Sequence, residues 1–327
     1  MVRRRIGLIA GSAAVASLVF AAGPRTTFDE AWVEPTLATD IDAYLGSVEA
    51  GVPDLRPGDD REVVWLDPTR TERTPISLVY LHGFSADRHE IEPVVSELAS
   101  DFGANVYFSR LTGHGRDGPA MAEATVEAWL SDTAEAVVIG ERIGEHVILV
   151  GTSTGGTLAL WAAARPEAAE RIDALVLISP NFQPKDRSSR ILLYPWGSTL
   201  ARAIIGPERC FTPENDAQER HWTTCYPTGA LPPMMALVEH MRTADLTGVK
   251  APVLLVYSPD DEVVDAAETE RVLMRLTGTE VRRYVVEGST DPMRHVVAGD
   301  IVSPASNAEV RSAVRDFLTD VFPPNPR

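Results

Sequence analysis

Apolar residues follow two spacings that alternate along most of this chain. Short, mainly β-branched apolar runs predict buried strands, and they lie at residues 62–66, 76–81, 105–108, 147–150, 174–178, 252–257 and 280–286. Longer segments with apolar positions at helical spacing lie at residues 40–48, 91–102, 126–143, 157–164, 268–276 and 308–322. Strands that alternate with helices need right-handed crossovers, so the pattern predicts a doubly wound, mainly parallel α/β sheet covered on both faces.

The alternation is interrupted once in the second half of the chain. Residues 181–250 contain no expected strand of the sheet and are too many for an ordinary connection. We therefore expect residues 61–180 and 251–327 to form one core, and residues 181–250 to form a helical cap over the carboxyl edge of its sheet. Ligands bind at that edge in open α/β sheets. A polar, proline-containing segment, residues 24–60, precedes the core.

The first residues have the layout of an export leader. Three arginines, Arg3 to Arg5, are followed by an apolar stretch that ends at Ala22. Residues 1–23 are expected to be a signal peptide or an uncleaved N-terminal membrane anchor, and the pattern leaves both open. Small residues before Pro24 suit a signal peptidase, whereas the apolar stretch is near the lower length limit for an anchor. Either way, the protein is expected to be exported to the periplasm or the extracellular space.

The composition excludes several classes of partner. The 327 residues are 44% hydrophobic and carry 30 basic against 47 acidic side chains, a formal net charge of −17. This charge argues against a nucleic-acid partner and against binding of the folded part to an anionic membrane, so membrane attachment is expected only through the leader. No HExxH or paired CxxC motif occurs among seven histidines and two cysteines, so we expect no metal and no cofactor.

The two cysteines, Cys210 and Cys225, lie in the expected cap. In an exported protein they are candidates for a disulfide, which would stabilise the fold by roughly 2–4 kcal/mol through the entropy of the unfolded chain. Two unpaired thiols are the alternative that the sequence leaves open.

The strongest chemical motif lies between an expected strand and an alanine-rich expected helix. Gly151-Thr152-Ser153-Thr154-Gly155 matches the G-x-S-x-G pattern of a nucleophile elbow. A serine at such a turn has a strained backbone, and its hydroxyl points out of the fold. Glycines at positions 151 and 155 are needed because side chains there would collide with the neighbouring strand and helix. Ser153 is therefore the candidate nucleophile.

A second motif, His82-Gly83-Phe84-Ser85, follows the strand expected at residues 76–81. In a nucleophile elbow, the oxyanion is bound by the amide after the serine and by an amide from the loop after an earlier strand. We expect these donors to be the backbone N–H groups of Thr154 and Phe84. Gly83 would let the backbone approach the substrate closely, and His82 would brace the loop by hydrogen bonding.

Two further loops supply a candidate acid and base. The turn after the strand at residues 252–257 contains Asp260, Asp261 and Glu262, any of which could orient a histidine or cap a helix instead. His295 follows the next strand and is the histidine best placed as general base. The order serine, acid, histidine is the order of α/β-hydrolase triads and differs from that of other serine-hydrolase folds.

These motifs resemble those of the α/β-hydrolase superfamily, and the resemblance covers the chain after residue 60. The segment Gly113-His114-Gly115 resembles that of monoacylglycerol-lipase-like, carboxylesterase-like and serine aminopeptidase (S33)-like members. In that group the acid turn usually contains D-x-V or D-x-L, which selects Asp261 because Val263 falls two places on. The resemblance gives His114 a supporting place beside the site. Thr152 and Thr154 depart from the usual elbow residues, so the substrate preference stays open.

The motifs together predict a serine hydrolase that cleaves carboxylic esters through an acyl-enzyme, with a small-molecule ester or lipid as its substrate. Medium-chain or monoacylglycerol esters are the hypothesis that the cap suggests. Four of its residues are apolar enough to line an acyl pocket, although packing of the cap onto the sheet explains them equally well: Leu193, Trp196, Met234 and Met235.

Two other functions remain open at this point. The same triad cleaves amides, and an acid of the cap could hold the free amine of a peptide: Glu214, Asp216 or Glu219. Acids in a polar loop are usually only solvated, however. A non-catalytic binding protein on the same scaffold is the remaining alternative, because a fold alone does not establish a function.

Overall fold

A computed structural model describes residues 17–323, so residues 1–16 of the expected leader lie outside the described residues. Seven strands form one sheet in the order β1-β3-β2-β4-β5-β8-β9. Their bounds are β1 Glu62–Val64, β2 Thr74–Leu81, β3 Asn105–Phe108, β4 Gly144–Thr152, β5 Ala174–Ile178, β8 Val253–Tyr257 and β9 Val281–Val285. β1 runs antiparallel to β3, and every other neighbouring pair is parallel. The expected doubly wound, mainly parallel sheet is thus confirmed.

Helices cover both faces of this sheet. α3 (Glu92–Phe102) and α10 (Asn307–Val321) cover one face, while α4 (Val126–Ile143), α5 (Thr154–Ala164) and α9 (Ala266–Leu273) cover the other. Successive strand residues point to opposite faces, so Leu78 and Tyr80 pack beneath α3 and α10, whereas Val79 and Leu81 pack beneath α4 and α5. This double burial explains why the strands are continuous apolar runs in the sequence.

Helix ends agree with the sequence expectation to within a few residues, and capping explains their positions. The Thr125 side chain accepts a hydrogen bond from the Ala128 N–H at 3.1 Å and begins α4, while Gly103 ends α3 in the left-handed conformation. α9 begins two residues earlier than expected because the Asp265 side chain accepts from the Ala267 N–H at 3.2 Å.

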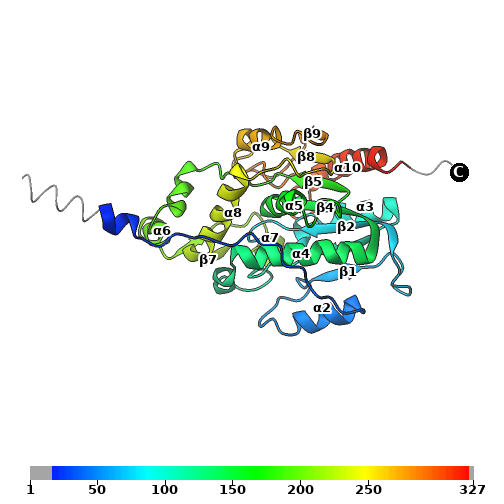
Figure 1. Ribbon diagram of the computed structural model, residues 1–327, viewed down its shortest axis with the longest axis horizontal. Helices are drawn as coiled ribbons and strands as arrows, with labels where there is room; N and C mark the ends of the chain where they lie inside the picture. The colour runs from blue at the N-terminus through cyan, green and yellow to red at the C-terminus, as the bar shows by residue number, and fades with distance from the viewer. Residues whose placement is uncertain (1–16, 324–327) are drawn as a thin grey trace, which may run out of the picture.

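The chain between β5 and β8 forms a structured cap. Its elements are η3 Arg187–Leu193, α6 Gly197–Ile205, β6 Glu208–Cys210, α7 Asp216–His221, β7 Cys225–Pro227, η4 Thr228–Ala230 and α8 Leu231–Thr243. β6 and β7 pair as an antiparallel ribbon in which Cys210 lies opposite Cys225, and the two are joined by a disulfide. Of the two alternatives that the sequence left open, the structure contains the disulfide. α6 and β7 lie together at one end of the sheet, away from the C-terminus (Figure 1).

Hydrogen bonds attach this cap to loops at the carboxyl edge of the sheet. The Thr223 N–H donates to the carbonyl of Ser85, which follows β2, at 2.7 Å. The Lys185 N–H donates to the carbonyl of Val263, which follows β8, at 2.9 Å. The cap therefore lies over the edge where parallel sheets bind their ligands.

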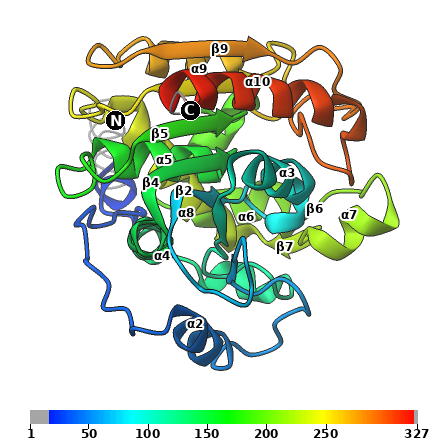
Figure 2. The same cartoon turned by 90° about the vertical axis from the view of Figure 1, so that its right-hand side faces the viewer.

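The segment before the core packs against it. Residues 24–37, called the strap below, run past α4 to α2 (Ile41–Glu49), and Figures 1 and 2 show them in dark blue. Trp32 of the strap stacks on Trp161 of α5, with ring centroids 5.8 Å apart. Within residues 17–323, no helix combines the length and the apolar character that crossing a membrane requires.

Candidate active site

Ser153 lies at the sharp turn between β4 and α5. Its φ of 51° and ψ of −114° are strained for a residue with a side chain, and hydrogen bonds such as that from its N–H to the Ile178 carbonyl (2.9 Å) hold it there. The two glycines of the motif are required by close approach. A Cβ atom on Gly151 would lie 2.5 Å from the carbonyl oxygen of Gly155, and one on Gly155 would overlap the carbonyl of Leu81.

Asp261 and His295 meet at the same edge of the sheet. The Asp261 carboxylate, 1% exposed, accepts a hydrogen bond from His295 Nδ1 through Oδ2 at 2.8 Å. Its Oδ1 accepts the N–H groups of Val263 and Val264, each at 2.8 Å, which fixes the carboxylate in the turn. The neighbouring acids are exposed, so Asp261 is the one that orients the histidine.

The surroundings of His295 favour its protonated form. Burial opposes protonation, but the charge and the hydrogen bond of Asp261, followed by the charges of Asp291 and Glu90, raise the pKa of His295 above its usual value. With Nδ1 on Asp261, the other ring nitrogen is left to exchange a proton with a substrate or with Ser153. Among residues 17–323, no hydrogen bond joins Ser153 to His295. Such bonds are often long before substrate binds.

Two unpaired amides lie beside the serine. A Cβ atom on Gly83 would lie 3.4 Å from the Ser153 Cβ, so the loop after β2 closely approaches the candidate nucleophile. The Gly83 N–H is occupied, because it donates to Glu90 Oε1 at 2.6 Å. In the described part of the chain, the N–H groups of Phe84 and Thr154 make no hydrogen bond. They are therefore available as the two oxyanion donors that the sequence motif predicts.

His82 and His114 brace the loops around this site. The Leu111 N–H donates to His82 Nε2, and the Ser85 N–H donates to His114 Nε2, both at 3.0 Å. His82 Nδ1 lies 2.8 Å from the Gly83 carbonyl oxygen, and the two imidazoles meet edge to face at 4.9 Å. Burial lowers the pKa of His82 to about 4 and that of His114 well below its usual value. We call this pair the histidine clasp; both of its members are neutral braces.

Glu90, in the short helix η1 (Arg88–Glu90), is a site residue that the sequence analysis did not identify. It is 3% exposed, and its Oε1 accepts from the Gly83 N–H and lies 2.6 Å from the Tyr80 hydroxyl. Burial raises the pKa of Glu90 to about 7, although both hydrogen bonds oppose the shift. Its only signal in the sequence is an acid at the start of a helix, which ordinarily marks a favourable charge at the helix N-terminus.

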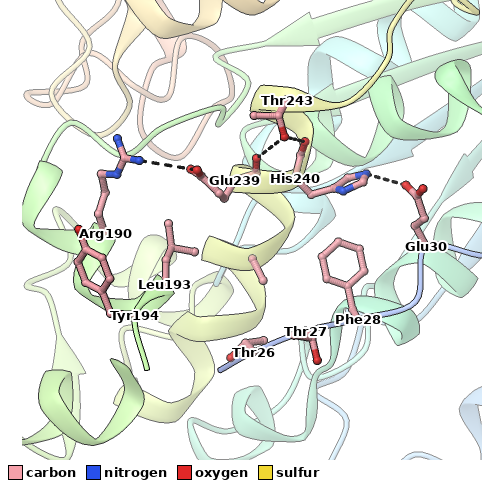
Figure 3. Close-up of a pocket in the computed structure, with 11 residues that line it drawn as sticks. Thr26, Thr27, Phe28, Glu30, Arg190, Leu193, Tyr194, Glu239, His240 and Thr243 are labelled. Atoms are coloured by element: carbon pink, nitrogen blue, oxygen red, sulfur yellow. Dashed lines mark hydrogen bonds and ion pairs between the residues drawn. The ribbon is translucent and has the colours of Figure 1, made fainter. Parts of the chain in front are cut away.

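Of the four expected pocket residues, Leu193 lines the cavity shown in Figure 3, and Trp196, Met234 and Met235 do not line it. The cavity has a volume of about 650 Å³ and lies between the strap and the cap, where Phe28 of the strap faces α8 (Figure 3). Ser153, Asp261 and His295 do not line it. Trp196 lies at the surface, 38% exposed, and its backbone N–H donates to the Pro24 carbonyl. The remaining lining residues are Thr26, Thr27, Glu30, Arg190, Tyr194, Ala236, Glu239, His240 and Thr243.

The two methionines lie deeper. Met235 is 2% exposed and belongs to the apolar core. The sulfur of Met234 accepts from the side-chain amide of Asn181 at 3.3 Å, and the Asn181 backbone N–H donates to the Ser153 carbonyl. Of the four expected pocket residues, Met234 is therefore the one that is connected, through Asn181, to the nucleophile elbow at Ser153. The three acids considered as amine ligands are all exposed: Glu214, Asp216 and Glu219.

Comparison with protein families finds one match that spans most of the chain. Residues 78–300 match the model of the "Alpha/beta hydrolase family". A curated relative, the thermostable monoacylglycerol lipase of Bacillus sp. (strain H-257), is 24% identical over 216 residues, which cover 65% of this chain and 82% of the relative.

Solved structures show the same fold. One of the metagenome-derived lipolytic enzymes LipS and LipT superposes with a TM-score of 0.66 at 19% identity, covering 82% of this chain and all of the other. The monoacylglycerol lipase of Paleococcus ferrophilus gives a TM-score of 0.57 at 17% identity, covering 80% of this chain and 98% of the other. A soluble variant of the monoglyceride lipase of Saccharomyces cerevisiae gives 0.60 at 12% identity, with coverages of 91% and 99%.

Proposed function

Because the chain belongs to the alpha/beta hydrolase family, we propose that it is a serine hydrolase that cleaves carboxylic esters with Ser153, His295 and Asp261. One observation carries this proposal. The strained Ser153, the Asp261–His295 pair and the unpaired amides of Phe84 and Thr154 lie on loops at the same edge of the sheet. This is the arrangement that two-step acyl transfer requires.

In the proposed reaction, His295 removes the proton of the Ser153 hydroxyl as its oxygen attacks the ester carbonyl. The N–H groups of Phe84 and Thr154 stabilise the negative oxygen of the tetrahedral intermediate. The intermediate collapses, the bond to the alcohol breaks, and His295 donates its proton to the leaving oxygen. A water molecule, deprotonated by His295, then attacks the acyl-enzyme, and the carboxylic acid and free Ser153 are released. This scheme uses no cofactor.

Monoacylglycerols or medium-chain acyl esters are the proposed substrates. The named relatives in Bacillus sp. and Paleococcus ferrophilus are monoacylglycerol lipases, and the cap supplies apolar side chains near the elbow, Met234 among them. A series of p-nitrophenyl esters of increasing chain length tests this proposal, with Ser153→Ala as the inactive control. Activity on acetate alone would contradict it.

Amide cleavage is the nearest rival function. Matched ester and amino-acid amide substrates separate the two, and we expect the ester to be cleaved faster because the acids of the cap that could hold an amine are exposed. Labelling of Ser153 by a fluorophosphonate probe separates both from a non-catalytic protein. An unlabelled Ser153 in the folded chain would contradict any hydrolase function.

We also propose that the protein functions outside the cytoplasm. The leader pattern of residues 1–23 supports export, and the Cys210–Cys225 disulfide suits an oxidising compartment. Fractionation of expressing cells and N-terminal sequencing of the product test this proposal and distinguish a cleaved signal from an anchor. Recovery in the cytoplasm with both thiols free would contradict it.

A further inference from the structure

Four potential metal ligands meet away from the catalytic residues. One ligand atom from each of Asp59, Asp87, His89 and His221 lies within 4.8 Å of the other three. Asp59 precedes β1, Asp87 and His89 lie in the loop and η1 that follow β2, and His221 ends α7 of the cap. Three segments that are distant in the sequence therefore converge on one point.

The spacing of these atoms fits a tetrahedral metal site. His89 Nδ1 lies 3.0 Å from Asp87 Oδ1 and 3.8 Å from Asp59 Oδ1. His221 Nδ1 lies 3.1 Å from Asp87 Oδ2 and 3.7 Å from Asp59 Oδ1. With metal–ligand bonds of about 2.0–2.1 Å, neighbouring ligand atoms of a tetrahedral zinc ion are about 3.3 Å apart. The four separations bracket this value, and they involve both oxygens of Asp87, with Oδ1 toward His89 and Oδ2 toward His221.

The two aspartates of the cluster are buried, and its two histidines are partly exposed. The side chains of Asp59 and Asp87 are each only 2% exposed, and Arg56 Nε binds the outer oxygen of Asp59 at 2.7 Å, which leaves Oδ1 facing the histidines. The other ring nitrogen of His89, Nε2, points away from the aspartates and lies 3.4 Å from Glu92 Oε2. A carboxylate on the outer nitrogen is the usual partner of a metal-bound histidine, because it fixes the ring and its tautomer.

Burying two aspartates side by side is costly without a cation. Both carboxylates are removed from water at this point, and their negative charges repel each other. A divalent ion between the carboxylates would offset both effects. The alternative is a network of ion pairs between the aspartates and protonated histidines, which would bind no metal.

We propose that Asp59, Asp87, His89 and His221 form a binding site for a divalent metal ion, and that zinc fits it best. Two imidazole nitrogens and two carboxylate oxygens form a donor set that suits tetrahedral zinc. The ion would join the cap to the loop that carries Phe84. These two segments already meet at the hydrogen bond from Thr223 to Ser85.

Metal titration of the full-length protein tests this site directly. After treatment with a chelator, we expect calorimetry to show one zinc ion bound per chain and a higher melting temperature in its presence. Cobalt(II) should give the strong visible absorption of a tetrahedral site. The cysteines form a disulfide, so this absorption would not arise from thiolates.

Variants identify the ligands. Asp59→Asn and His221→Asn should each weaken zinc binding at least tenfold. His146→Asn is the matched control, because it removes a histidine paired with Asp173 at 2.9 Å outside the cluster, and it should bind as the unmodified protein does. Absence of stoichiometric binding, or equal binding by His221→Asn, would overturn the proposal. His221 lies at the end of a cap helix, so this variant decides the matter even if Asp59→Asn fails to fold.

Discussion

At the scale of the residue, the backbone of Ser153 is the most informative feature. A non-glycine residue with a φ of 51° stores strain. The backbone packs so closely around Gly151 and Gly155 that the turn is held in this strained conformation. Under the proposed function, stability and catalysis therefore oppose each other at this position.

Replacement of Ser153 should separate these two effects. Ser153→Ala and Ser153→Gly should both lower kcat by several powers of ten. Glycine accepts a positive φ, so Ser153→Gly should be more stable than Ser153→Ala by about 1 kcal/mol, the reverse of their usual order. Chemical denaturation of the two variants measures the difference. Equal stabilities would mean that the turn is not strained.

Asp261 should control the pH dependence of the reaction. His295 must be neutral to accept a proton, so activity should fade as the pH falls through its raised pKa. Asp261→Asn removes the main cause of that increase, so the acid limb of kcat/KM should move to lower pH while the maximal rate falls by about 10⁴. The exposed neighbour provides the control, because Asp260→Asn should leave the profile unchanged. A shift in both variants would contradict the assignment.

At the scale of the element, hydrogen bonds to Glu90 and to the histidine clasp hold the loop after β2 in place. Glu90 accepts a hydrogen bond from the Gly83 N–H, next to the unpaired N–H of Phe84. The histidine clasp joins the same loop to the one after β3. Both devices hold the loop that carries Phe84, the proposed oxyanion donor.

Removal of the Glu90 carboxylate should therefore act on kcat more than on KM. Glu90→Leu should lower kcat about 10- to 100-fold with little change in KM, because loss of an oxyanion donor weakens binding of the transition state alone. Glu90→Gln keeps an oxygen that can accept from Gly83 and should recover most of the rate. A loss confined to KM would show that Glu90 does not position this loop.

The histidine clasp should make the fold sensitive to acid. The pKa of His82 falls from 6.5 to about 4 on folding, so its neutral form stabilises the fold fully above pH 6.5, and this contribution is lost as the pH falls toward 4. The expected loss is about 3 kcal/mol. Denaturation at several pH values measures it. His82→Gln should be less stable at neutral pH and should show a shallower decline, and an unchanged slope would contradict the prediction.

At the scale of the whole molecule, the sequence predicted the sheet, its helices and the loops of the site, because those features depend on local apolar spacing and on the order of motifs. Glu90, the clasp and the Asp59 cluster depend instead on which loops become neighbours after folding. The packing of the strap also has no local signal. Trp32 is one aromatic residue in a polar segment, and its partner Trp161 lies in another element.

The strap should contribute measurably to global stability. Trp32→Ala removes the stack on Trp161 and should lower the free energy of unfolding by about 2 kcal/mol. The adjacent residue serves as a control, because Val33 is 60% exposed and Val33→Ala should change stability by less than about 0.5 kcal/mol. Thermal denaturation of both variants provides the comparison. Equal effects would mean that the strap is not held by this contact.

The strap also determines where the chain can be shortened for protein production. A version that begins at the start of the family match, residue 78, would lack the strap, β1 and the first half of β2, and it would expose the apolar surface of α5 to solvent. Exposed surface of this kind promotes aggregation. A recombinant version that retains the chain from Pro24 onward keeps this surface covered.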